Sequence, residues 1–213
     1  MIVHVEGDEV AMTTTGTARE LAVPLGSVDV GHLVFTRGAS NLTIGVDASM
    51  EDLYRARFDG RVPEVAVDGG TVTVRYRPSL HHTSGEITLS AQVPWDIEAR
   101  WGMSHVVADL EDLEFGGLVI SGGSSHIEMR LPRPRRTVGV RIGGGASDVS
   151  LLRPAGVPVR VRIGGGVSKL AIDDFRLGSG GGKIDWQGPD YDRVEARYDI
   201  EIGAGASEIT VRT

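Results

Sequence analysis

Hydrophobic residues recur in a fixed pattern on both sides of a series of glycines. Apolar side chains lie five and three positions before each glycine, as Val140 and Ile142 do before Gly145, and again four and six positions after it. Alternation with a period of two is typical of a β-strand with one buried and one exposed face. Charged residues such as Arg141 stand between the apolar positions. Each unit is therefore predicted to be a strand, a glycine corner and a second strand.

Six copies of this unit occur in the chain. Their corner glycines are Gly38, Gly102, Gly123, Gly145, Gly166 and Gly205, and the copies read like GASDVSL or GVSKLAI. From residue 102 to residue 166 the steps are 21, 22 and 21 residues, and the next step is 39, nearly two periods. We therefore expect a degenerate copy near residues 180–186. Two short strands cannot bury their apolar face alone, so the copies are predicted to stack about 4.8 Å apart.

The repeated glycines are interpreted as corners. A sharp turn between strands needs a positive φ or a close approach of two backbones, and glycine allows both. The spacing excludes a dinucleotide-binding loop, because GGGASD and GGGVSK put Asp148 and Lys169 where that fingerprint has its third glycine. GSGGGKI fails as a P-loop, since Leu177 and Ile184 replace its glycine and its Ser or Thr. No cofactor is expected.

Residues 46–84 interrupt the repeat and are predicted to be an insertion. Ser49 and Asp52 form a plausible capping box, and apolar residues follow at helical spacing from Leu53. This pattern predicts one short helix over residues 49–58.

A hairpin is predicted after that helix. Residues 63–78 alternate between apolar and polar on both sides of Asp68-Gly69-Gly70, a strong turn sequence. The whole chain, 1–213, is thus predicted to be a single all-β domain of stacked, β-solenoid-like repeats. The repeats are most regular over 85–213, and the helix and hairpin are inserted near 47–78.

Composition agrees with this fold and excludes several function classes. Thirty glycines argue against a helical bundle, because an interior glycine costs a helix about 1 kcal/mol. The net charge of −7 argues against general nucleic-acid binding. The chain has no cysteine, which suits a reducing compartment. Glu6, Asp8 and Glu9 stand where a signal peptide would be apolar, and no run of about 18 apolar residues exists. A cytoplasmic location without an integral membrane segment is expected.

The repeats resemble a known family of bacterial β-repeat domains. IGGGASDVSLL and IGAGASEITVRT are similar to the toast-rack repeats of bacterial adhesin-like proteins and of cell-wall-stress response proteins. The resemblance covers residues 85–213 and, less closely, 20–45. It implies a scaffold that is often attached to a membrane protein or a signalling component.

The repeated serines are the first candidates for chemistry. They lie two positions after each corner glycine, at Ser40, Ser104, Ser125, Ser147, Ser168 and Ser207. A catalytic serine needs one activated copy beside a base, whereas a hydroxyl that stabilises a turn is useful in every copy. The serines are therefore interpreted as structural, and no catalytic residue is expected.

Histidines and carboxylates are the next candidates. His105 and His126 occupy equivalent positions in adjacent copies and could stack, but the other copies have Asn, Asp, Lys or Glu there, which is typical of a solvated column rather than a metal site. His81-His82 point apart on an extended chain. The acidic run 109–114 and the pair Asp173-Asp174 are interpreted as solvated loops rather than as calcium or glycosidase sites. No metal is expected.

Two candidate interaction sites remain. RLPRPRR gathers Arg130, Arg133, Arg135 and Arg136, which could bind an acidic protein, a phosphate or an acidic membrane surface. Residues 198–212 are predicted to form an open edge of the stack, with Ile209 and Val211 on the inward face. Such an edge would pair with a second copy or a partner strand.

Two functions of different classes are left open. The first is a non-catalytic scaffold or adaptor that binds a protein partner or its own copies, linked to envelope or stress signalling. The second is a carbohydrate-binding or polysaccharide-active protein, for which Trp95 and Trp101 are the nearest aromatic platform. The scaffold is preferred because no copy breaks the pattern with clustered aromatic, acidic and basic residues.

Overall fold

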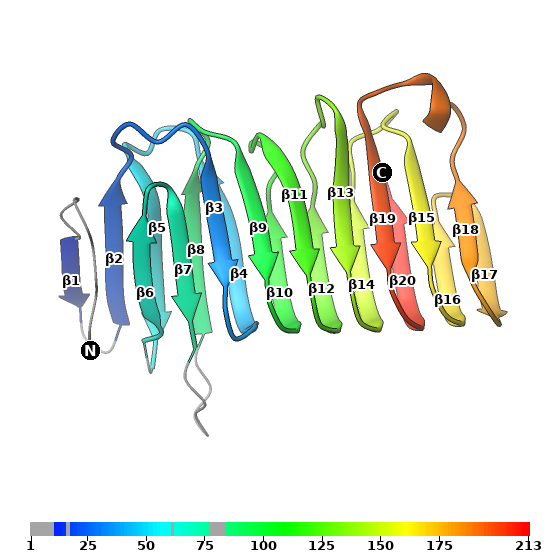
Figure 1. Ribbon diagram of the computed structural model, residues 1–213, viewed down its shortest axis with the longest axis horizontal. Helices are drawn as coiled ribbons and strands as arrows, with labels where there is room; N and C mark the ends of the chain where they lie inside the picture. Colours follow the sequence, from blue (N-terminus) through cyan, green and yellow to red (C-terminus); the bar gives the residue numbers. More distant parts are fainter. Residues whose placement is uncertain (1–10, 16–17, 61, 77–83) are drawn as a thin grey trace.

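The protein consists of two β-sheets that pack face to face (Figure 1). The computed structural model describes residues 11–15, 18–60, 62–76 and 84–213, with side chains from residue 20 onward. The only helical turn among these residues is a short 3₁₀ turn, η1 (Tyr191–Arg193). The all-β prediction with stacked strand repeats is confirmed.

Strands of the two sheets alternate along most of the chain. The eleven-stranded sheet contains β1 (Ala11–Thr15), β2 (Ala18–Pro24), β5 (Asp52–Asp59), β8 (Ser84–Ser90), β4 (Ala39–Asp47), β10 (Met103–Asp109), β12 (Ser124–Arg130), β14 (Ala146–Leu152), β20 (Ala206–Arg212), β16 (Val167–Ile172) and β17 (Phe175–Gly180), in that spatial order. The nine-stranded sheet contains β6 (Glu64–Asp68), β7 (Thr71–Arg75), β3 (Gly31–Phe35), β9 (Trp95–Ala99), β11 (Phe115–Ile120), β13 (Thr137–Ile142), β19 (Arg197–Ile202), β15 (Val159–Ile163) and β18 (Ile184–Gln187).

A strand of the nine-stranded sheet, its glycine corner and the next strand of the eleven-stranded sheet form one rung. Neighbouring rungs such as β11–β12 and β13–β14 pair in parallel, so that equivalent residues stack: Leu118 lies beside Val140, and Ile127 beside Val149. These inward side chains are almost fully buried between the sheets. Each contributes about 1.5–3 kcal/mol by leaving water, which makes the stack of rungs self-supporting.

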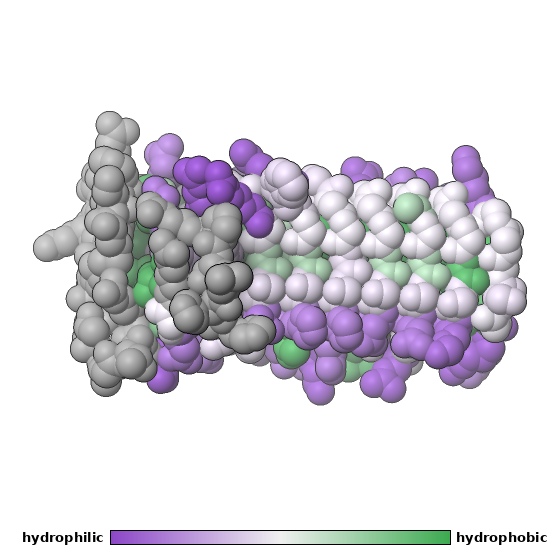
Figure 2. Space-filling model, turned by 90° about the horizontal axis from the view of Figure 1, so that it is seen from below, coloured by the Kyte–Doolittle hydropathy of each residue, from purple (hydrophilic) through white to green (hydrophobic). Residues whose placement is uncertain are grey.

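The corner glycines are required by close packing of successive rungs. A Cβ added at Gly102 would lie 2.7 Å from the carbonyl oxygen of Gly123, and one added at Gly145 would lie 3.1 Å from that of Gly205. Neither Gly145 nor Gly166 has a positive φ, so close backbone approach explains the glycines at these two corners. At Gly38 both reasons apply, because its φ is 77° and a Cβ there would lie 2.5 Å from the carbonyl oxygen of Gly102. Viewed from the corner edge, a pale stripe of near-neutral residues runs along the stack beside hydrophilic side chains (Figure 2).

Positive φ occurs at the third residue after every corner glycine. The six residues are Asn41, His105, His126, Asp148, Lys169 and Glu208, with φ between 52° and 55°. Left-handed backbone is unusual for residues other than glycine, and Asn, Asp and His tolerate it best. The serine before each of these residues and the residue itself therefore both lie on the outer face of the sheet.

The spatial order of the rungs differs from their order in the sequence. The rung β19–β20 is inserted between β13–β14 and β15–β16, so β20 is paired in parallel with both β14 and β16 (Figure 1). The expectation that residues 198–212 form an open edge is wrong. Ile209 is 1% exposed and Val211 is not exposed at all, because each has a rung on either side.

The described residues of the predicted insertion, 46–60, 62–76 and 84, contain strands and turns and no helix. Residues 52–59 form β5 rather than a helix, because Tyr54, Ala56 and Phe58 alternate toward the core. Ser49 instead donates from both its backbone N–H and its hydroxyl to Asp47 Oδ1 in a tight turn. The predicted hairpin is confirmed as β6–β7, whose two-residue loop Gly69-Gly70 has positive φ at both positions.

Antiparallel strands close both ends of the parallel stack. At one end β17 and β18 add to β16 and β15, and they take the place of the degenerate copy expected near residues 180–186. At the other end β6 and β5 are antiparallel to β7 and β8. Reversed strands with charged residues such as Arg176 and Asp185 hinder further pairing at an edge.

Candidate interaction site at the loop edge

A groove opens at the loop edge, on the side of the stack opposite the glycine corners. It lies where the acidic loop 110–114, between β10 and β11, meets the basic loop 131–136, between β12 and β13. Its volume is about 440 Å³. The two loops are adjacent because their rungs are: the N–H of Leu110 donates to the carbonyl of Arg130 (3.0 Å).

One ion pair joins the two loops, and a second joins the end of β12 to the acidic loop. Arg135 Nη1 lies 2.8 Å from Glu114 Oε2, and Arg130 Nη1 lies 4.0 Å from Glu111 Oε2. Arg133 donates to the carbonyl of Ala155 in the next loop (3.0 Å). All of these side chains are exposed, so each pair contributes at most about 1 kcal/mol to stability.

Arg136 and Asp112 remain available to a partner. Among the residues that the structure describes, neither side chain takes part in an ion pair or a hydrogen bond. Both are exposed at the groove. The site therefore offers one cation and one anion that are not already neutralised, beside Arg135, whose side chain is 80% exposed.

Buried residues hold the groove in shape. Leu113, Phe115, Pro132 and Pro134 are buried beneath the charged side chains. The hydroxyl of Tyr198 donates to the carbonyl of Pro132 (2.7 Å), and burial raises the pKa of this tyrosine well above its usual value. Because prolines fix φ and the floor is buried, the arginines project from a rigid base.

The period of the repeat already contained the signal for this pairing. Glu114 and Arg135 are 21 residues apart (135 − 114 = 21), the same step as between the corner glycines 102 and 123. Equivalent positions of adjacent rungs must face each other. The sequence interpretation treated the acidic and the basic run as separate features.

The serine and histidine candidates lie on the outer face of the eleven-stranded sheet. The rings of His105 and His126 stack in parallel, with centroids 4.4 Å apart, and His126 Nε2 lies 3.8 Å from Asp148 Oδ2. Parallel rings direct their nitrogens sideways rather than toward a shared ion. Within the described part of the chain, no three His, Asp or Glu side chains converge as metal ligands. His81 and His82 lie outside the described residues.

The remaining candidates are separated in space. Trp95 is buried and its indole N–H donates to the carbonyl of Ser90 (2.9 Å), whereas Trp101 is 67% exposed at the glycine corner. The two tryptophans therefore do not form one platform. Asp173 binds the buried Arg153, and Asp174 is exposed.

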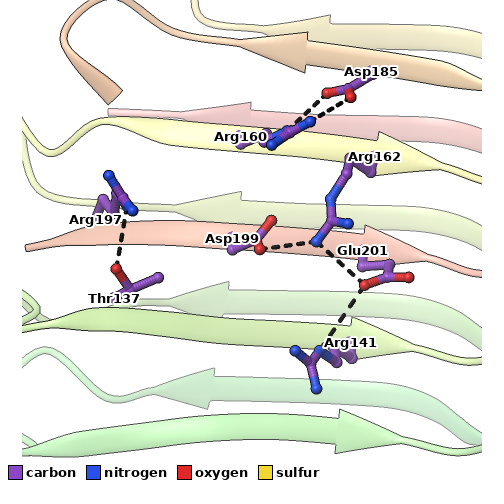
Figure 3. A network of polar contacts seen from close by, with 8 residues as sticks. All are labelled: Thr137, Arg141, Arg160, Arg162, Asp185, Arg197, Asp199 and Glu201. Carbon is purple, nitrogen blue, oxygen red and sulfur yellow. Dashed lines mark hydrogen bonds and ion pairs between the residues drawn. The ribbon is translucent and has the colours of Figure 1, made fainter. Parts of the chain in front are cut away.

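Sequence reasoning missed two features of the structure. One is a hollow of about 410 Å³ between the loop after β2 and the Gly69-Gly70 turn, where His32 lies 3.7 Å from Asp96. The other is a network of arginines and carboxylates on the outer face of the nine-stranded sheet (Figure 3). No helix in the described residues is long and apolar enough to cross a membrane.

Comparisons with known proteins identify a likeness of fold. No protein-family model and no curated protein matches the sequence. Among solved structures, the chain is similar to a protein from Clostridium sporogenes described as a "putative cell adhesion protein". The identity is 16% and the TM-score is 0.62, with 96% of this chain and 98% of the other covered. This likeness extends over nearly the full length of both chains and shows a shared fold.

Proposed function

We propose that the protein is a non-catalytic interaction module that binds a partner polypeptide in the groove at its loop edge. The observation that carries this proposal is the rigid, mixed-charge groove in which Arg135, Arg136 and Asp112 are exposed above a buried floor. An extended segment of a partner that carries acidic side chains would meet the arginines, and its N–H groups would meet the carboxylates.

The fold supports the same proposal. The solved structure that it resembles is described as a "putative cell adhesion protein", a description of an interaction role. We assign the chain, on the resemblance of its repeats, to toast-rack β-repeat scaffolds of bacterial envelope or stress signalling. We further propose that it works in the cytoplasm, because a chain without cysteine needs no oxidising compartment.

The test is capture of partners by the immobilised protein at low and high salt. A variant with Arg135 and Arg136 changed to glutamate should lose the bound partner, and binding to the original protein should weaken as salt rises. Chemical cross-links from the partner should map to residues 111–114 and 132–136.

A matched control separates this groove from general charge effects. Arg100→Glu and Arg176→Glu also reverse exposed arginines, but these lie away from the loop groove, at the corner edge and on the end strand. The control variant should keep the partner. Equal loss of binding in both variants, or cross-links confined to other surfaces, would refute the proposal.

A further inference from the structure

The rung β19–β20 occupies a slot that earlier parts of the chain leave open. This slot lies between the rungs β13–β14 and β15–β16, which are neighbours in sequence but not in space. In the nine-stranded sheet Ile200 stacks between Val140 and Val161. A slot one strand wide, about 4.8 Å on each side, is thus bounded by two parallel, in-register partners.

The outer side chains of the inserted rung are complementary to those of the slot. Asp199 and Glu201 of β19 lie between Arg141 of β13 and Arg162 of β15 (Figure 3). Arg162 Nη2 lies 2.8 Å from Asp199 Oδ2 and 3.4 Å from Glu201 Oε2. Arg141 Nε lies 4.0 Å from Glu201 Oε2. The carboxylates of the rung are thus paired with an arginine on each wall of the slot.

In the other sheet the opposite charge stands on one side only, because the residue of β14 level with Glu208 is Asp148. Glu208 of β20 forms an ion pair with Lys169 of β16. At the loop edge Arg153, which follows β14, binds Asp173, which follows β16, so that this ion pair passes across the end of β20. The slot therefore recognises its rung by charge as well as by strand pairing.

The segment before the rung has the properties of a hinge. Residues 188–196 connect β18 to β19, and most of them are exposed. The main anchor of the segment belongs to the rung itself: the guanidinium of Arg197 stacks over the ring of Tyr191 at 4.5 Å and donates to its carbonyl (2.6 Å). Outside the rung, the segment is held by the Thr137 hydroxyl, which donates to the carbonyl of Glu195 (3.0 Å), and by Gln187, which donates to Asp192 Oδ2 (2.6 Å). An exposed segment with so few contacts can change its path while the two strands of the rung stay intact.

From these contacts we infer that the slot is a binding site for the rung β19–β20 of a second copy of this chain. Two copies exchange their rungs reciprocally, each copy fills the slot of the other, and only the hinge 188–196 changes its path. The strand pairing and the ion pairs of the rung with both walls are retained in such a dimer, which is why exchange of an identical element is a low-cost route to association. This inference is independent of the groove at the loop edge.

A second copy fits the slot better than an unrelated strand does. An occupant must supply a glycine at the corner, since a Cβ at Gly203 would lie 2.3 Å from the carbonyl oxygen of Gly143. It must also carry carboxylates at the positions of Asp199, Glu201 and Glu208. The chain's own rung meets all these requirements together.

Engineered cysteines test the exchange directly, because the chain has none of its own. Ser150 of β14 and Thr210 of β20 are directly paired and half-buried, and neighbouring strands about 4.8 Å apart are within disulfide range. One copy carries Ser150→Cys and the other Thr210→Cys. The two are unfolded together, refolded and oxidised. We expect a covalent dimer that contains one copy of each, and the double variant in one chain provides the control that the pair can bond.

Charge inversion adds a second, independent measurement. One copy receives Arg141→Glu and Arg162→Glu in its slot, and the other receives Asp199→Arg and Glu201→Arg in its rung. Each copy then mismatches itself, but the mixture restores every pair by reciprocal exchange. The mixture should contain at least about tenfold more dimer than either copy alone, the ratio expected from several half-exposed pairs. The chain with all four changes restores the pairs in every copy, so it should fold and associate as the original chain does.

Two results would overturn the inference. A mixture that stays monomeric while the four-change chain folds would show that the slot accepts only its own rung. A dimer that forms without the disulfide between positions 150 and 210 would show that copies associate through another surface.

Discussion

Arg153 and Asp173 form an ion pair that spans three strands. Arg153 follows β14 and Asp173 follows β16, and the end of β20 lies between them. The Arg153 side chain is only 5% exposed, and it also donates to the carbonyl of Val157 (2.6 Å). Burial lowers the pKa of the Arg153 guanidinium, an effect that the Asp173 carboxylate opposes. Leu110 and Leu131 are the buried residues at the same place in the two preceding rungs.

This ion pair predicts that the protein tolerates loss of Arg153 but loses stability when Asp173 is removed. Asp173→Ala leaves a buried guanidinium without its carboxylate and should destabilise the protein by about 1–3 kcal/mol, less than for a fully buried pair because Asp173 is partly exposed. Arg153→Leu restores the residue of the preceding rungs and should stay within about 1 kcal/mol of the original. Urea unfolding of both variants measures the change in the free energy of unfolding. An equal decrease in the two variants would contradict the prediction.

The corner glycines should tolerate no side chain. A Cβ at Gly102 would lie 2.7 Å from a backbone oxygen of the next rung, so Gly102→Ala should cost about 1–3 kcal/mol through overpacking. Gly178→Ala is the matched control, because a Cβ there has no atom within 4 Å. Ser147→Ala should change stability little. If thermal unfolding gives Gly102→Ala and Gly178→Ala the same midpoint temperature, the packing argument is refuted.

The left-handed residues predict an unusual ranking of substitutions. Asp148 has φ 52°, which asparagine adopts readily and a β-branched residue does not. Asp148→Asn should be nearly neutral, whereas Asp148→Val should destabilise by about 1–2 kcal/mol. Chemical denaturation can measure both. If Asp148→Val leaves stability unchanged, the backbone at residue 148 must be able to leave the left-handed conformation without cost.

The pair Lys169–Glu208 predicts a dependence on acid. The hydrogen bond from Lys169 lowers the pKa of Glu208 in the folded state below its usual 4.5. The pair therefore contributes stability above that usual pKa, and the contribution is lost as the pH falls through the lowered folded value. Glu208→Gln should weaken the fall in the urea midpoint between pH 7 and pH 3. Glu128→Gln, on the same sheet face without an ion pair among the described residues, should leave the fall unchanged.

The regular part of the fold was predictable because its pattern is local. Alternating residues such as Val140 and Ile142 define a strand, and a glycine after them defines a corner. The prediction of a helix at 49–58 was wrong because Leu53 and Ala56 fit a helical spacing, whereas Tyr54, Ala56 and Phe58 also fit the alternation of a strand. Sheet partners on both sides of β5 decided in favour of the strand.

The order of the rungs was not predictable from hydrophobicity. Val140, Val161 and Ile200 are interchangeable as inward residues, so apolar pattern alone cannot say which rungs are neighbours. Charge carries that information: the acidic β19 fits between strands that carry Arg141 and Arg162. For the loop-edge site the sequence interpretation found the arginine cluster, but it did not use the 21-residue step that places Glu114 beside Arg135.

The internal place of the rung β19–β20 also determines how the protein resists mechanical force. A pull on Arg212 along the strand loads the ladders of β20 with β14 and with β16 at the same time. Their hydrogen bonds then share the load in shear instead of opening one after another. A strand at the end of the stack, such as β17, is held by a single neighbour and can peel away. The last rung in the sequence is thus mechanically one of the most firmly held parts of the molecule.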